Sequence, residues 1–100
     1  MGDGGAVATV ALLMNECLSP HPGRAQEDQR ELMWRAPVGD RPPRVIEWTC
    51  DCLPTVYELC ESGGQAYLRR TSRGKVEETP RVNVNEGRAI WSDLLAGRAQ

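Results

Sequence analysis

Three of the four cysteines of this chain, Cys50, Cys52 and Cys60, lie in one short stretch. Thiols this close in sequence can bind a metal, form a disulfide, take part in redox exchange, or fill a core as small apolar side chains. No other stretch gathers groups of comparable chemical capacity. Each of these uses implies a different function, so the cysteines are the first residues to interpret.

A metal site is one interpretation of this spacing. Residues two apart in an extended strand point to the same face, so Cys50 and Cys52 would present their sulfurs side by side. Structural zinc takes four ligands, usually as two close pairs, and the second pair would combine Cys60 with Cys17 or His21. If a metal is bound, the sequence therefore predicts zinc on Cys50, Cys52, Cys60 and Cys17.

Burial is the favoured alternative, because unpaired cysteines are among the most buried residue types. Thiol exchange ranks last, since Asp51, Glu58 and Glu61 surround these thiols with negative charge and disfavour the thiolate. We also expect reduced thiols and a cytoplasmic protein, as no export signal is recognisable. In the favoured interpretation the protein binds no cofactor. If it binds one, the cysteines predict zinc.

Other catalytic signatures are missing from the sequence. His21, the single histidine, lies between Pro20 and Pro22, a context typical of an exposed loop. Phosphate-binding glycine loops, the H-E-x-x-H motif and the G-x-S-x-G motif do not occur. The sequence therefore favours a protein that is not an enzyme, although residues distant in sequence can still converge.

One basic cluster could bind nucleic acid. Arg69, Arg70 and Arg73 follow Tyr67 and would lie on a strand and its turn, where they could contact phosphates. The formal net charge of −2 opposes binding to nucleic acid through bulk electrostatics. An ordinary charged hairpin is the favoured interpretation of this cluster.

Strand-forming patterns occupy much of the second half of the chain. Two of them flank the pair Gly63 and Gly64, which suits a hairpin turn with positive φ. A capping-box pattern, Thr55 with Glu58, supports a rival helix over residues 55–62, but the alternation of apolar residues favours the hairpin. The expected strands are residues 44–50, 56–60, 65–71 and 75–79.

A helix is predicted at the C-terminal end. Asn83 is a suitable N-cap with Glu86 at the third helical position, and Gly97 is a suitable stop. Ile90, Trp91 and Leu94 then fall on one stripe that would cover the sheet. The predicted fold is α+β: a small antiparallel meander of three or four strands over residues 44–79, packed by a helix over residues 84–96.

Residues 1–43 are expected to form an N-terminal arm, separate from a core domain of residues 44–100. The arm would contain helices over residues 6–18 and 24–35 and a Pro/Gly-rich linker over residues 37–43. The apolar run of residues 6–14 is about half the length of a bilayer span, so no membrane partner is expected.

The leading functional hypothesis is a non-catalytic accessory or regulatory protein that binds another protein or a second copy of itself. The core has few large apolar residues and no Phe, so surface apolar area is expected to be covered by a partner. The alternative is a zinc-stabilised module that contacts nucleic acid through the basic cluster. The predicted contact residues for the leading hypothesis are Leu12, Leu13, Leu32 and Trp34.

Two strings of the sequence, residues 57–71 with Tyr57, Cys60 and the Gly63-Gly64 pair, and residues 91–97 with Trp91, loosely resemble small proteins of GC-rich actinobacteria. The resemblance covers about half the chain and leaves out residues 1–43. That group has no assigned activity, so the resemblance implies a bacterial origin and no site residues.

Overall fold

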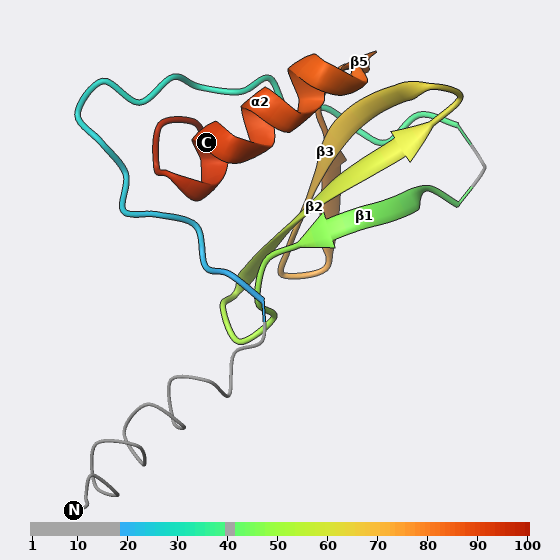
Figure 1. The fold of residues 1–100 in the computed structure, drawn as a ribbon. Helices are drawn as coiled ribbons and strands as arrows, with labels where there is room; N and C mark the ends of the chain where they lie inside the picture. Colours follow the sequence, from blue (N-terminus) through green and yellow to red (C-terminus); the bar gives the residue numbers. More distant parts are fainter. Residues whose placement is uncertain (1–18, 40–41) are drawn as a thin grey trace, which may run out of the picture.

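The computed structural model describes residues 19–39 and 42–100 of the chain. Its elements follow one another as β1 (Arg44–Trp48), β2 (Thr55–Ser62), β3 (Gln65–Ser72), β4 (Lys75–Glu78), β5 (Val82–Asn83) and α2 (Val84–Leu95). The first four strands form an antiparallel meander in the order β1-β2-β3-β4, and β5 pairs with the start of β3. Helix α2 lies across this sheet (Figure 1). The predicted α+β meander with a C-terminal helix is therefore confirmed.

The central hairpin forms where the paired glycines predicted it. β2 and β3 are in register along their whole length, and the turn between them is formed by Gly63 and Gly64 with φ of 60° and 80°. The next turn repeats this geometry with Arg73 at φ 54° and Gly74 at φ 81°. Two successive residues with positive φ match the right-handed twist of the flanking strands. The rival helix over residues 55–62 is therefore wrong, because alternation outweighs the capping pattern.

Helix α2 begins and ends as its sequence predicts. The Asn83 side chain accepts a hydrogen bond from the Glu86 N–H at 2.7 Å, and Gly97 takes φ 80° just beyond the last turn. The helix buries Trp91 and Leu94 against the face of the sheet that carries the following apolar side chains: Tyr57, Leu59, Ala66 and Leu68. Gly87 allows the close approach, since an added Cβ would lie 2.5 Å from that of Ala66.

The helix predicted over residues 24–35 is wrong. The chain from residue 19 to 39, here called the strap, runs in extended form past the C-terminal end of α2 and on to the far edge of the sheet (Figure 1). Its N–H groups donate hydrogen bonds to carbonyls at the end of α2 and in the C-terminal tail. The pairs are Gly23 to Leu95 at 2.8 Å, Gln26 to Gly97 at 3.0 Å, Arg30 to Arg98 at 3.0 Å and Leu32 to Gln100 at 2.9 Å. These tertiary hydrogen bonds replace the local ones that helix propensity would favour.

The strap also completes the core. Leu32 and Trp34, two residues apart, both pack against the buried cluster, as expected for an extended segment with one face on the protein. Arg35 then exchanges backbone hydrogen bonds with Glu78 at 3.0 and 2.8 Å, so the strap reaches the edge strand β4. The predicted helix over residues 6–18 lies outside the described residues. Within the described ranges, no helix combines the length and apolar content needed to cross a membrane.

Candidate functional site

The loop after β1 carries Cys50 and Cys52 and is held at its start by Thr49. The Thr49 N–H donates to the Tyr57 carbonyl at 2.8 Å, and its buried hydroxyl accepts from the Tyr57 N–H at 2.9 Å. One residue on, the Cys50 N–H donates to the Pro20 carbonyl at 2.9 Å. This last bond holds the start of the strap beside the loop, which brings together segments thirty residues apart in the sequence.

The two segments assemble a small cluster of thiol and imidazole groups. The ligand atoms of His21, Cys50 and Cys52 all lie within 4.8 Å of one another. Cys52 Sγ is 3.3 Å from His21 Nε2, and the Cys52 N–H points at Cys50 Sγ at 3.4 Å. Cys50 is buried, whereas His21 and Cys52 are exposed. In the described part of the chain, this is the one group of His, Cys, Asp and Glu side chains with the spacing of metal ligands.

The cluster differs from the ligand set predicted by sequence. Cys50 and Cys52 are brought together as expected, and His21 joins them. Cys60 lies elsewhere: it is fully buried in β2, paired with Tyr67 across the β2–β3 hairpin. Cys17 lies outside the described residues. The sequence offered His21 only as the alternative to Cys17, and its position between two prolines favoured an exposed loop. The tertiary bond from the Cys50 N–H to the Pro20 carbonyl is what places His21 beside the two cysteines.

Burial makes Cys60 a packing residue. Desolvation raises the pKa of its thiol to about 11, against a partial lowering by the Arg69 charge. A shift from 9.0 to about 11 reduces the thiolate fraction near neutral pH about 100-fold. The interpretation of Cys60 as core filling therefore fits both its position and its acidity.

We expect Cys60 to resist alkylation in the folded protein. With iodoacetamide at about pH 8, Cys60 should stay unmodified for as long as the chain is folded, because its thiol is protonated and enclosed. Peptide mass spectrometry after a timed reaction would measure the modified fraction. The same residue in guanidinium chloride is the control and should react readily. Native modification at a rate within tenfold of the unfolded control would contradict this assignment.

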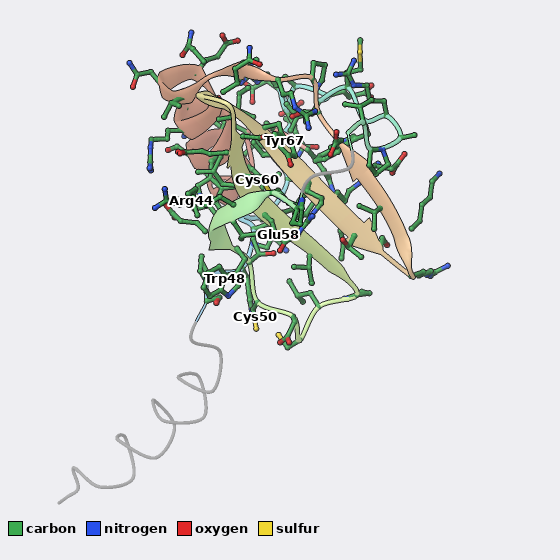
Figure 2. All side chains as sticks on the ribbon, turned by 90° about the vertical axis from the view of Figure 1, so that its right-hand side faces the viewer. Arg44, Trp48, Cys50, Glu58, Cys60 and Tyr67 are labelled. Atoms are coloured by element: carbon green, nitrogen blue, oxygen red, sulfur yellow. The ribbon has the colours of Figure 1, made fainter. Side chains whose placement is uncertain are left out.

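A second feature lies beside the cluster, on the sheet face away from α2. Alternation along β2 sends Tyr57 and Leu59 toward the helix and Glu58 and Cys60 the opposite way. Figure 2 shows Tyr67, Cys60, Glu58 and Trp48 following one another down this second face. Trp48 is 52% exposed although it is a large aromatic side chain in a strand.

The far end of this second face is covered and the near end is open. At the far end, the Arg81 guanidinium lies 4.2 Å from the centre of the Tyr67 ring and also pairs with buried Glu78 at 2.8 Å. The strap closes this end, because the Val38 N–H donates to Glu78 Oε1 at 2.9 Å. The near end, here called the open face, consists of Trp48, Val56, Glu58, Arg69, Thr71 and Val76.

The open face combines apolar side chains with a neutralised ion pair. Val56, Thr71 and Val76 are paired across β2, β3 and β4, and Val76 is 37% exposed. Beside this row, the Arg69 guanidinium contacts Glu58 Oε1 at 2.7 Å. Trp48 borders two shallow hollows, of about 290 Å³ toward Cys50 and about 180 Å³ toward Pro20.

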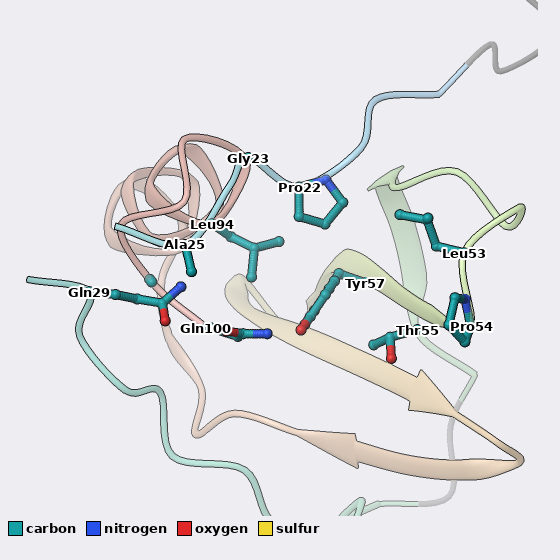
Figure 3. A pocket seen from close by; sticks show the side chains of 11 residues that line it. Pro22, Gly23, Ala25, Gln29, Leu53, Pro54, Thr55, Tyr57, Leu94 and Gln100 are labelled. Carbon is teal, nitrogen blue, oxygen red and sulfur yellow. The ribbon is translucent and has the colours of Figure 1, made fainter. Parts of the chain in front are cut away.

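Another hollow opens on the opposite side of the β1–β2 loop, between that loop and the strap. It has a volume of about 250 Å³ and is lined by apolar groups, among them Leu53 and Leu94, with the Tyr57 and Gln100 side chains at its floor (Figure 3). Its lining contains no Asp, Glu, Lys, Arg, His or Cys side chain, and its hydroxyl groups are those of Thr55 and Tyr57. Neither hydroxyl has a general base in the lining that would activate it as a nucleophile.

The basic residues predicted for nucleic acid do not form one patch. Arg69 and Arg70 are neighbours in β3 and point to opposite faces. Each forms a short ion pair, Arg69 with Glu58 at 2.7 Å and Arg70 with Glu77 at 2.6 Å. Arg73 is exposed in the β3–β4 turn. This arrangement fits the balanced charged hairpin that the sequence favoured.

Two of the four predicted partner contacts lie against the chain's own core. Leu32 and Trp34 pack against the buried cluster, with the Arg70 guanidinium 4.3 Å from the centre of the Trp34 ring. Leu12 and Leu13 lie outside the described residues. The large apolar side chains that the described residues expose are instead Met33, Val38, Trp48 and Val76.

Comparisons with known proteins give no match. No protein-family model, curated protein or solved structure matches this chain. The functional argument therefore depends on the geometry of the chain's own residues.

Proposed function

We propose that this protein is a non-catalytic accessory domain that binds a protein partner through the open face. The observation that supports this most is the half-exposed Trp48 between two hollows at the near end of the sheet. Tryptophan is among the residues most enriched at the energetic centres of protein interfaces, since it buries a large area with little loss of side-chain freedom. A reducing compartment such as the cytoplasm is part of this proposal, because it would protect the exposed Cys52 thiol from oxidation.

Charge favours a protein over nucleic acid as the partner. The chain carries a net charge of −2, and the one arginine of the open face is already paired with Glu58 at 2.7 Å. Nucleic acid binding depends on cations that can neutralise phosphates. To contact a phosphate, the Arg69 guanidinium would first have to break its ion pair with Glu58. An apolar protein surface can bind the open face without breaking this ion pair.

The partner is proposed to dock on the face of the sheet and not along its edge. At the outer edge, β1 contains a register shift between Val45 and Glu47. Such bulges twist an edge strand and oppose the addition of another strand. On the other edge, the strap already pairs with β4 through Arg35 and Glu78. Face-on contact around Trp48 remains the accessible mode.

Replacement of Trp48 by alanine tests the proposal. A photo-crosslinking amino acid at position 76, on the open face, leaves Trp48 in place. In the cells that make the protein, it should capture a defined protein that the same group at position 33 does not. With that protein purified, calorimetry should show Trp48→Ala weakening the complex by about 30-fold or more, as expected for an interface centre worth at least about 2 kcal/mol.

Met33→Ala is the matched control, because Met33 is 69% exposed and lies in the strap, outside the open face. It should change the affinity less than about twofold. Circular dichroism should show that both variants keep the fold. Equal affinities of Trp48→Ala and the unmodified chain would refute the open face as the binding surface, as would capture of nucleic acid alone at position 76.

A further inference from the structure

We infer that His21, Cys50 and Cys52 form a zinc-binding site that fastens the strap to the β1–β2 loop. Thiolate sulfur and imidazole nitrogen are the donors that tetrahedral zinc prefers. The three donors come from two segments that the chain brings side by side, and they do not include the buried Cys60. This inference is independent of the open face and stands whether or not Trp48 binds a partner.

The distances fit a tetrahedral ion. Zinc bonds of about 2.3 Å to sulfur and about 2.0–2.1 Å to nitrogen place two sulfurs about 3.8 Å apart and a sulfur and a nitrogen about 3.5 Å apart. Cys52 Sγ lies 3.3 Å from His21 Nε2, and no pair in the cluster is separated by more than 4.8 Å. The observed separations exceed these ideal ones by at most about 1.3 Å, a difference within the range of side-chain rotation.

Backbone contacts hold the three donor side chains close together without a metal. The Cys52 N–H points at Cys50 Sγ at 3.4 Å, and a hydrogen bond to sulfur favours the thiolate that zinc requires. Pro20 and Pro22 restrict the backbone on both sides of His21, so the imidazole is presented from a stiff segment. The bond from the Cys50 N–H to the Pro20 carbonyl, 2.9 Å, fixes the spacing between the two segments.

Three protein donors leave one position of a tetrahedral zinc ion for a fourth ligand. A further protein side chain there would make the site a closed, structural one, whereas water would leave it open.

Zinc would add a crosslink where the strap begins. One cluster residue belongs to the strap and the other two to the loop after β1, so a bound ion would hold these segments together beyond the single hydrogen bond from Cys50 to Pro20. Because zinc would bind the folded chain in preference to the unfolded one, it should raise the thermal midpoint.

Metal titration of the full chain, reduced and freed of metal, tests the inference. We expect one zinc per chain, and a cobalt complex whose visible bands are those of a tetrahedral site with sulfur-to-cobalt charge transfer in the near ultraviolet. Cys52→Ser and His21→Ala should each weaken zinc binding at least about 100-fold, since each removes one of only three or four ligands. Removal of zinc with a chelator should lower the thermal midpoint of the unmodified chain and leave that of Cys52→Ser unchanged.

Cys60→Ala is the matched control: it removes a cysteine of the same stretch that the geometry leaves out, and it should bind zinc as tightly as the unmodified chain. The inference is overturned if Cys60→Ala loses zinc, if Cys52→Ser and His21→Ala bind zinc unchanged, or if non-reducing mass spectrometry finds Cys50 and Cys52 joined in a disulfide.

Discussion

Replacing Trp91 by alanine should lower the free energy of unfolding by about 3–5 kcal/mol, the usual loss when a buried large aromatic side chain is removed from a core. Trp91 is 3% exposed and packs among the apolar side chains of β2 and β3. Its Nε1 also donates to Glu47 Oε1 at 3.1 Å, which ties α2 to the edge strand β1. Urea denaturation followed by circular dichroism measures the loss.

Trp48→Ala is the control for this experiment, since it removes the same side chain from a strand where it is 52% exposed. Its cost should be under about 1 kcal/mol, as surface substitutions usually have small effects. Because a domain of this size is stabilised by roughly 5–15 kcal/mol, the Trp91 variant should also unfold at a clearly lower temperature. Equal losses for the two variants would contradict the arrangement of helix and sheet.

Gly97→Ala should destabilise the protein by about 3 kcal/mol, through backbone strain and through overpacking. Gly97 has φ 80°, a conformation that costs any other residue free energy. An added Cβ would overlap the carbonyl oxygen of Arg24, in the part of the strap that crosses the end of α2. The strap must therefore lift from the helix end to accept the methyl group.

Gly64→Ala separates the two contributions, because Gly64 has the same φ of 80° but nothing within 4 Å of an added Cβ. It should cost only the conformational strain, about 1–2 kcal/mol. Hydrogen exchange gives a local readout: in Gly97→Ala the Gln26 and Arg30 N–H groups, which donate to the Gly97 and Arg98 carbonyls, should lose protection. If Gly64→Ala and Gly97→Ala cost the same, the strap is not packed against the helix end.

Much of the fold could be predicted because its signals are local. The paired glycines specify a two-residue turn. The Asn83 side chain caps the helix by accepting from the Glu86 N–H, and the stripe of Ile90, Trp91 and Leu94 defines the buried face of the helix. Each signal acts within a few residues, so no knowledge of the rest of the chain is needed.

The strap could not be predicted in this way. Its composition favours a helix, yet its hydrogen-bond partners lie at the opposite end of the chain. The Gln26 side chain, for example, donates to the Ala96 carbonyl at 3.0 Å, although the two residues are 70 positions apart in the sequence. Propensity measures only what a segment gains by itself. Pairing with the C-terminal tail and burial of Leu32 and Trp34 gave the extended form a larger gain.

The candidate sites likewise contain some features that local sequence predicts and others that depend on tertiary contacts. The sequence by itself favoured burial for the cysteines in general, without singling out Cys60, which it also predicted as a metal ligand. It determined that Cys50 and Cys52 would lie near each other, because residues two apart are close in any conformation. Only the tertiary structure decided that His21 joins them and that Trp48 stays exposed while Trp91 is buried. The physical reason is that neighbours along the chain are fixed by covalent geometry, whereas contacts across the fold depend on which surfaces the helix and the strap cover.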